Sequence, residues 1–254
     1  MLQVRRPHAI LALALATLAA ACGADSSTAP AAPVTLDQAL SELSTPVLSS
    51  ATGLFDSGTP TLPALAASRC AFQASSQSFA CTPLVANGIT VTQSFTLLDG
   101  SGASQSAFDQ ATTSAVRTNT AVTGTFQDGA EQFSIDGQQQ LTLSGLRESI
   151  HTLDGTTTVH VVSNGGGGLP FETNVTMTIT GLKLQPPTAD GTHPWPKAGT
   201  IVVENSTVLG DASPAVVRAT ITFNGTSKVT VNLVGPGVSG TCTVDLASQA
   251  PSCS

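Results

Sequence analysis

The chain has 254 residues, of which 41% are hydrophobic and only 10% are charged, against about 25% charged in an average soluble domain. The formal net charge is −7 and the basic residues beyond Pro7 are scattered, which argues against nucleic acid and anionic lipid surfaces as partners. Thr, Ser, Gly, Ala and Val take the place of the missing charges, and this composition is typical of an exported β protein.

The first 21 residues have the order of a secretory signal. Arg5 and Arg6 lie in a start without acidic residues, and the apolar run from Ala9 to Ala21 ends in small side chains. The run is about 13 residues long, whereas a helix needs roughly 20 to cross a bilayer. We therefore expect residues 1–21 to be a signal peptide that is removed, rather than a permanent membrane anchor.

The end of this run carries a second motif. The stretch Leu18-Ala19-Ala20-Ala21-Cys22 resembles the lipobox of bacterial lipoproteins, although the lipobox usually has Leu where Ala19 stands. The resemblance implies that Cys22 is acylated, becomes the mature N-terminus and anchors the chain to a membrane. The alternative is ordinary cleavage after Ala21, which leaves a free cysteine.

Residues 22–34 are expected to join the lipid to the folded part. Gly23 to Val34 is a Gly, Ala, Ser, Thr and Pro stretch with one charge, Asp25, and cannot bury a core, so it predicts a flexible tether. In lipoproteins like this one, Asp directly after the lipidated Cys retains the protein at the inner membrane. Here Gly23 follows, so the expected location is the cell envelope, at the outer membrane where the cell has one.

Residues 35–254 are expected to form a single β-rich domain that begins with one short helix. Thr35 and Gln38 have the spacing of a helix N-terminus, and Pro46 ends the run. Between them, Leu36, Ala39, Leu40 and Leu43 share one face, so the pattern predicts an amphipathic helix packed on the sheet that follows.

Four cysteines remain besides Cys22, and an even number outside the cytoplasm suggests two disulfides. Cys70 and Cys81 enclose turn-forming residues at a C-x10-C spacing, as do Cys242 and Cys253. A hairpin at each turn would place each pair face to face, so we predict the bridges 70–81 and 242–253. A metal site is the weaker reading because no C-x2-C or H-x3-H spacing occurs.

From Cys70 onward the hydrophobic period is two, and dipeptides that favour tight turns recur. These turns are Asn87-Gly88, Asp99-Gly100, Asp128-Gly129, Asp136-Gly137, Asp154-Gly155, Asn164-Gly165, Asp190-Gly191 and Asn224-Gly225. The expected strands are Ile89–Leu98, Ala115–Phe126, Gln132–Ile135, Gln139–Leu143, Arg147–Leu153, Thr156–Ser163, Glu172–Leu184, Thr200–Leu209, Ala215–Phe223, Thr226–Val234 and Thr241–Leu246. Short connections give antiparallel neighbours, so we predict an all-β antiparallel meander that forms a large curved sheet or barrel.

The hairpin at Asn224-Gly225 predicts how apolar and polar residues are distributed over the two faces of the sheet. A three-residue loop with Gly225 left-handed would pair Ala219 with Val229 and Val217 with Val231. It would place the apolar residues of both strands on one face, whereas a two-residue loop would divide them between faces. The sheet is therefore expected to have one solvent-exposed polar face and one buried apolar face.

The sequence contains no motif for catalysis or for a cofactor. There is no G-x-S-x-G, and the glycine run at 165–168 lacks the helix with Lys that a phosphate loop needs. A two-residue hairpin at Asp154-Gly155 would make His151 and His160 diagonal neighbours, but the pattern supplies no third metal ligand. We interpret both as solvent-face histidines, and we expect no cofactor and no enzymatic activity.

Trp195 is the one tryptophan and lies in His193-Pro194-Trp195-Pro196. Its ring could close one end of the apolar face, or it could contact a glycan, lipid or partner. The leading hypothesis is a non-catalytic envelope lipoprotein with a structural role or with a protein partner or ligand. The alternative is a carrier of a hydrophobic ligand with a half-open barrel, and a secreted hydrolase is a third.

Overall fold

The computed structural model describes residues 70–166, 168–185, 195–247 and 250–253, and the regular structure in them is β-strand. The predicted signal peptide, the lipidation site, the tether and the helix lie outside these residues. The strands are β1 (Cys70–Gln73), β2 (Ser78–Cys81), β3 (Leu84–Ala86), β4 (Ile89–Asp99), β5 (Ser104–Gln105), β6 (Thr113–Asp128), β7 (Glu131–Ser144), β8 (His151–Ser163), β9 (Phe171–Leu184), β10 (Ala198–Leu209), β11 (Ala215–Phe223), β12 (Lys228–Gly235), β13 (Val238–Asp245) and β14 (Ala250–Cys253).

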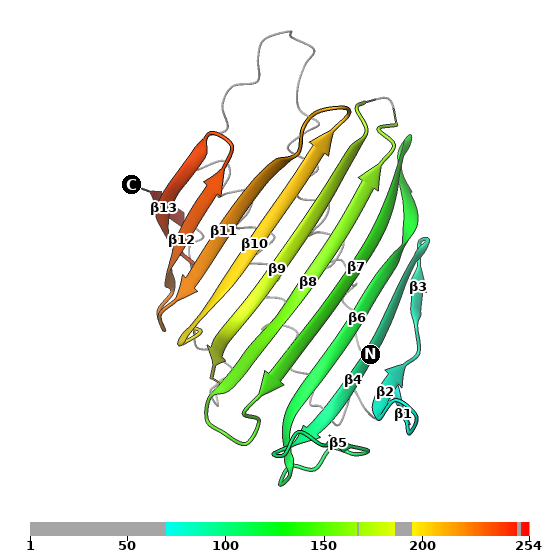
Figure 1. Ribbon diagram of the computed structural model, residues 1–254, viewed down its shortest axis with the longest axis vertical. Helices are drawn as coiled ribbons and strands as arrows, with labels where there is room; N and C mark the ends of the chain where they lie inside the picture. The colour runs from blue at the N-terminus through cyan, green and yellow to red at the C-terminus, as the bar shows by residue number, and fades with distance from the viewer. Residues whose placement is uncertain (1–69, 167, 186–194, 248–249, 254) are drawn as a thin grey trace, which may run out of the picture.

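The strands form one antiparallel sheet in which sequence neighbours lie side by side (Figure 1). The order is β1-β2-β4 and then β6 through β14 in sequence, while β3 and β5 each pair with β4. The predicted all-β meander is confirmed. Within the described residues the sheet does not close into a barrel, because β1 and β14 remain at opposite edges.

Several of the predicted Asn-Gly and Asp-Gly turns are confirmed. Asn87 and Gly88 have positive φ angles of 51° and 79° between β3 and β4, as a tight hairpin turn requires. Gly129 also has a positive φ, of 61°, between β6 and β7. These dipeptides therefore act as the turn chemistry predicts.

Two of the predicted turns are wrong, because Asp136-Gly137 lies inside β7 and Asp154-Gly155 inside β8. At Gly155 the backbone of β7 comes so close that a Cβ would lie 2.1 Å from the carbonyl oxygen of Gln140. The register between β8 and β9 shifts there, and the carboxylate of Asp154 accepts a hydrogen bond of 2.6 Å from the amide of Gly181. The extra residue is on β9, where Thr180 and Gly181 together oppose Asp154, so the Asp-Gly pair faces a β-bulge and does not reverse the chain.

The β11–β12 hairpin has the predicted faces but another register. Ala219 pairs with Leu233 and Ile221 with Val231, so the connection is longer than three residues. Asn224 and Thr226 stabilise it, since Asn224 Oδ1 accepts from the Thr226 amide and Thr226 Oγ1 accepts from the Lys228 amide. The shift is an even number of residues, so every side chain keeps its predicted face.

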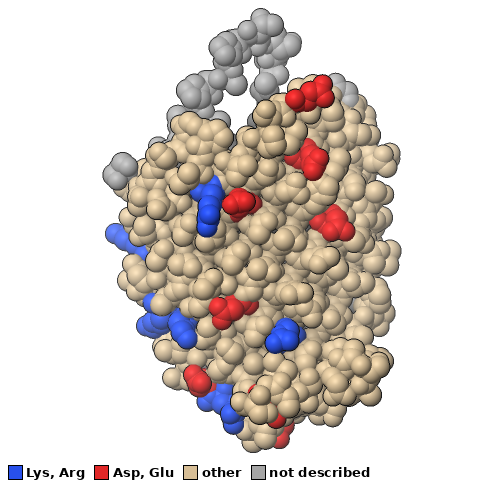
Figure 2. All heavy atoms as spheres, viewed as in Figure 1, with Lys and Arg blue, Asp and Glu red and all other residues tan. Residues whose placement is uncertain are grey.

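The sheet has one apolar and one polar face. Burial alternates along β12, where Val229, Val231 and Leu233 are buried and the residues between them are exposed. Directly paired residues share a face, so these valines and leucine adjoin Ile221 and Cys242 on the neighbouring strands. The polar face is turned toward the viewer in Figure 2, where charged side chains are sparse and spread out.

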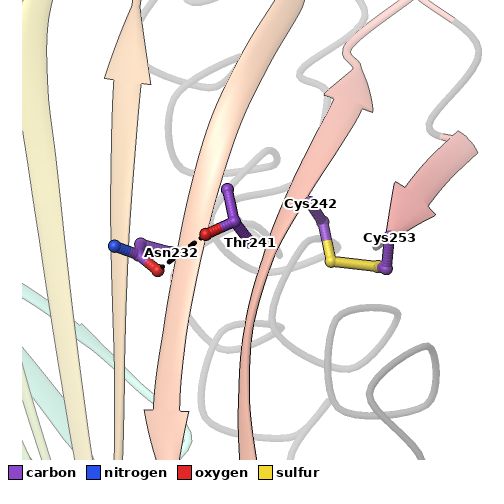
Figure 3. Close-up of a disulfide and its surroundings, with 4 residues drawn as sticks. All are labelled: Asn232, Thr241, Cys242 and Cys253. Carbon is purple, nitrogen blue, oxygen red and sulfur yellow. Dashed lines mark hydrogen bonds between the residues drawn. A yellow bond between two sulfur atoms is a disulfide. The ribbon is translucent and has the colours of Figure 1, made fainter.

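Both predicted disulfides are confirmed. Cys70 is bonded to Cys81 and Cys242 to Cys253, with Cα atoms 3.8 and 4.1 Å apart. Each pair is also a directly facing pair of its hairpin, as the spacing predicted. Figure 3 shows the second bridge between β13 and β14.

Candidate functional site

A row of hydroxyl side chains crosses the polar face near one end of β9 to β14. Its members are partners in the sheet register, one from each strand: Thr180, Thr200, Thr222, Thr230, Thr243 and Ser252. Adjacent strands are about 4.8 Å apart, so the hydroxyls are closely and evenly spaced. All of these residues except Thr200 are exposed.

A second row runs beside the first, two residues away along each strand. It consists of Thr178, Val202, Thr220, Asn232 and Thr241, again as direct partners. Over β9 to β13, threonine therefore occupies eight of the ten positions in the two rows. In this second row the Thr241 hydroxyl donates to Asn232 Oδ1 at 3.1 Å (Figure 3). We call these two rows the threonine surface.

The polar face carries one ion pair among the described residues. His160 Nε2 lies 3.2 Å from Glu172 Oε1, and both side chains are about half exposed, at 43% and 51%. Asp136 faces His160 from β7. Among the described residues no group of three His, Cys, Asp or Glu side chains is placed to hold a metal ion.

The predicted proximity of the two histidines is wrong. His151 begins β8 and faces Leu184, whereas His160 lies nine residues later on the same strand. At about 3.3 Å per residue, roughly 30 Å of strand separates them. The reason is that β8 stays paired with β7 through Asp154 and Gly155, so the strand continues where a hairpin would have folded it back.

Two turn carboxylates have lowered pKa values for local structural reasons. The hydroxyl of Ser101 and the amides of Ala103 and Ser101 hold the pKa of Asp99 below its usual value. For Asp109, the amide of Ala111 and the side chain of Thr112 lower the pKa in the same way. Both carboxylates accept hydrogen bonds within their own turns, which is structural rather than catalytic chemistry.

The glycine loop after β8 is also satisfied by its own side chains. Buried Ser163 donates from its hydroxyl to Glu131 Oε1 and accepts from the amide of Gly165 at 3.1 Å. Asn164 Oδ1 accepts from the amides of Gly166 and Gln132. Several backbone donors that a phosphate would need are therefore already bonded within the protein.

A polar band crosses the apolar face, and sequence reasoning missed it. It consists of Gln93, Thr120, Gln139 and Thr157, which are direct partners across β4, β6, β7 and β8. Gln139 Nε2 donates to Thr157 Oγ1 at 3.2 Å. The signal was present in β7, because Gln139 falls at an apolar position of the alternation that contains Ile135 and Leu141.

A second polar group on the apolar face bonds within itself. Thr173 Oγ1 lies 2.9 Å from Asn205 Oδ1 and 2.9 Å from Thr207 Oγ1, and Thr207 also donates to Asn205. Thr173 is buried. The cluster joins β9 to β10, and the buried hydroxyl of Thr173 has its hydrogen-bond partners within it.

Trp195 lies just before β10 and is partly buried. The residues after it are fastened to the sheet, since Pro196 is buried and its carbonyl accepts from the Gly225 amide at 2.9 Å. The Lys197 amide donates to the Lys183 carbonyl at 2.8 Å. Trp195 therefore directly precedes residues that are held between the end of β9 and the β11–β12 turn, and a contact of its ring with a ligand stays a prediction.

Comparison of the chain with protein-family models, curated proteins and solved structures finds no match. Among the described residues there is no helix with the length and apolar character needed to cross a membrane. The function is therefore inferred from the surfaces of the sheet and from the N-terminal motifs.

Proposed function

We propose that the protein is a non-catalytic lipoprotein of the cell envelope that is anchored through Cys22 and contacts a partner through its threonine surface. The regular rows of Thr residues on an exposed, largely uncharged face carry the proposal. The lipobox-like sequence before Cys22 supports the anchoring. The partner would be a protein or another envelope component with a matching polar surface.

Threonine side chains on such a surface are better suited to binding a partner than to catalysis. Its hydroxyl donates and accepts hydrogen bonds, and its β-branched side chain is already restricted in χ1 by the strand, so little freedom is lost on binding. A hydroxyl becomes a nucleophile only beside a base or metal. Thr222 and Thr230 have Thr200 and Thr243 as their partners in the row, which is a hydrogen-bonding and not a proton-transfer environment.

Site-specific photo-crosslinking in living cells tests this proposal. A photoreactive side chain at Thr222 or Thr230 should give a membrane-bound adduct of defined mass, and the same group at Ser134, on the same face of β7, should not. Thr222→Arg should reduce the adduct formed from Thr230. Equal labelling from all three positions, or none, would contradict a specific contact at the threonine surface.

A hydrophobic-ligand carrier is the second candidate, and the polar band favours it. Gln93, Thr120, Gln139 and Thr157 could hold the polar head of an amphiphile whose chain lies on the neighbouring apolar residues. A carrier should copurify with lipid that organic extraction and mass spectrometry detect, and Gln139→Leu should reduce the amount bound. Protein isolated without lipid, and unable to bind fatty acid, would exclude this candidate.

A further inference from the structure

The apolar face is buried although the described strands form a single layer. Leu233 is 0% exposed, and Val229 and Leu182 are 1% exposed. One sheet can shield its own hydrogen bonds, but its two faces stay open to water unless a second layer covers them. Since β1 and β14 are separate edges, the sheet does not close over itself.

We propose that residues 35–68 of the same chain form this second layer, lying on the apolar face across the sheet. The inference is independent of the proposed function. The segment has the composition of a covering layer: Leu36, Leu40 and Leu43 at helical spacing, followed by Val47, Leu48, Leu54, Phe55, Leu62 and Leu65. It contains three charged residues, Asp37, Glu42 and Asp56.

The segment is joined to the sheet at the edge formed by β1. It is followed by Arg69 and then by Cys70, the first residue of β1. Cys70 and Phe72 pack against buried Phe79 and Phe95, so β1 contributes side chains to the apolar face at one edge of the sheet. Because β1 is an edge strand, the preceding residues can turn directly onto that face.

The length of the segment is sufficient. Eleven intervals separate β1 from β14 along the sheet path, which at about 4.8 Å each is roughly 53 Å. A ten-residue helix spans about 15 Å, and the remaining residues can extend by about 3.3 Å each, giving roughly 80 Å more. The segment can therefore cross the whole face and still make turns.

The polar band would offer hydrogen-bond partners to such a layer. The stretch from residue 51 to 68 contains Pro60 and Pro63 and predicts irregular backbone, whose N–H and C=O groups need partners when buried. A glutamine side chain offers both donors and an acceptor. Gln139, which is partly buried, could pair with this backbone, and this would explain an amide at a position where the alternation predicts an apolar residue. Gln93, at the β4 end of the band, is exposed.

Covalent attachment favours this occupant over a second copy or a free ligand. A segment joined directly to β1 is present at a high effective concentration, of the order of millimolar for a short connection. A competing molecule would have to displace it. In the mature chain, the residues before position 35 are 22–34, whose side chains are mostly small or polar and cannot replace it.

The test uses the full mature chain with Cys22→Ser, which removes the lipid. A photoreactive side chain at Leu40 should form a crosslink within one molecule to peptides of the apolar-face strands, and Ser41, on the other side of the predicted helix, should not. Leu40→Glu should raise the exchange rate of β12 amides by about tenfold or more, whereas Ser41→Glu should leave it nearly unchanged. Crosslinks between molecules would assign the face to a second copy and overturn the proposal.

Two further outcomes would also overturn it. Lipid found on the wild-type face, with residues 35–68 accessible to protease, would assign the face to a ligand. Unchanged β12 exchange in Leu40→Glu, together with no crosslink from Leu40, would place the segment elsewhere. The crosslink is formed on a chain with an apolar replacement at Leu40, so it remains readable if the glutamate variant does not fold.

Discussion

Two neighbouring residues of β12 allow the division of the sheet into two faces to be measured. Leu233 is 0% exposed on the apolar face, while Val234, the next residue, is 59% exposed on the polar face. Replacing either residue by alanine removes methyl groups from the same strand. The difference between the two variants therefore reports burial rather than the properties of the strand.

The structure gives the expected magnitudes. Leu→Ala at a fully buried position costs about 2–5 kcal/mol, and the larger values apply where the surroundings cannot collapse into the cavity. Leu233 adjoins Ala219 on one side and Gly240 on the other, and such small neighbours cannot move side chains into the space. We therefore expect about 4 kcal/mol for Leu233→Ala and less than about 1 kcal/mol for Val234→Ala, mainly from β-propensity.

Urea unfolding of the Cys22→Ser protein, followed by circular dichroism, measures both values. The midpoint should fall strongly for Leu233→Ala and little for Val234→Ala, with unchanged slopes. Equal destabilisation by the two variants would refute the assignment of faces. A loss below about 1 kcal/mol for Leu233→Ala would mean that water reaches the apolar face in solution.

Four further predictions follow from the sequence and the structure. Cys22→Ser should move the protein from the membrane to the soluble fraction while its circular dichroism stays unchanged, and a mutant that stays membrane-bound would contradict lipid anchoring. Replacing both Cys242 and Cys253 by serine should cost about 3 kcal/mol in urea unfolding, because the bridge closes a loop of about twelve residues; peptide mapping that linked Cys70 to either of them would refute the hairpin pairing. Gly155→Ala should destabilise strongly, since its Cβ would lie 2.1 Å from the Gln140 carbonyl, whereas Gly137→Ala should be tolerated because its nearest contact is 3.5 Å; equal thermal midpoints would contradict the close approach. Trp195 emission should be blue-shifted, resist iodide quenching and ignore added fatty acid if the ring packs on a filled core, and a saturable response to fatty acid would support the carrier.

The features predicted from sequence are those set by local chemistry. Alternation of apolar and polar residues in 215–223 and 228–235 placed Ile221 and Val231 on one face, and the structure has them there. The cysteine spacing gave both bridges because a short hairpin leaves each pair one arrangement. Turns at Asn87-Gly88 and Asp128-Gly129 were predicted because Asn and Gly tolerate the positive φ that Asn87, Gly88 and Gly129 adopt.

What could not be predicted depends on neighbours distant in sequence. Asp154-Gly155 has the composition of a turn, but β7 and β9 continue past it on both sides and keep β8 extended. The glycine is needed because Gln140, on another strand, approaches its backbone. In the same way, the polar band at Gln93, Thr120, Gln139 and Thr157 forms only when four registers are known together.

The positions of the two disulfides follow from the openness of the sheet. An open sheet has two edges, and a strand at an edge has one neighbour instead of two, so it frays more easily and can pair with other chains. Here β1 and β14 are those edge strands, and each has only four residues. Cys70–Cys81 fastens β1 to β2, and Cys242–Cys253 fastens β14 to β13. The covalent bonds thus lie where hydrogen bonding is weakest, while the interior strands β6 to β10, with twelve to sixteen residues each, hold together through two long ladders. Because such bonds form and persist mainly in oxidising surroundings, this way of securing the edges is consistent with the proposed export.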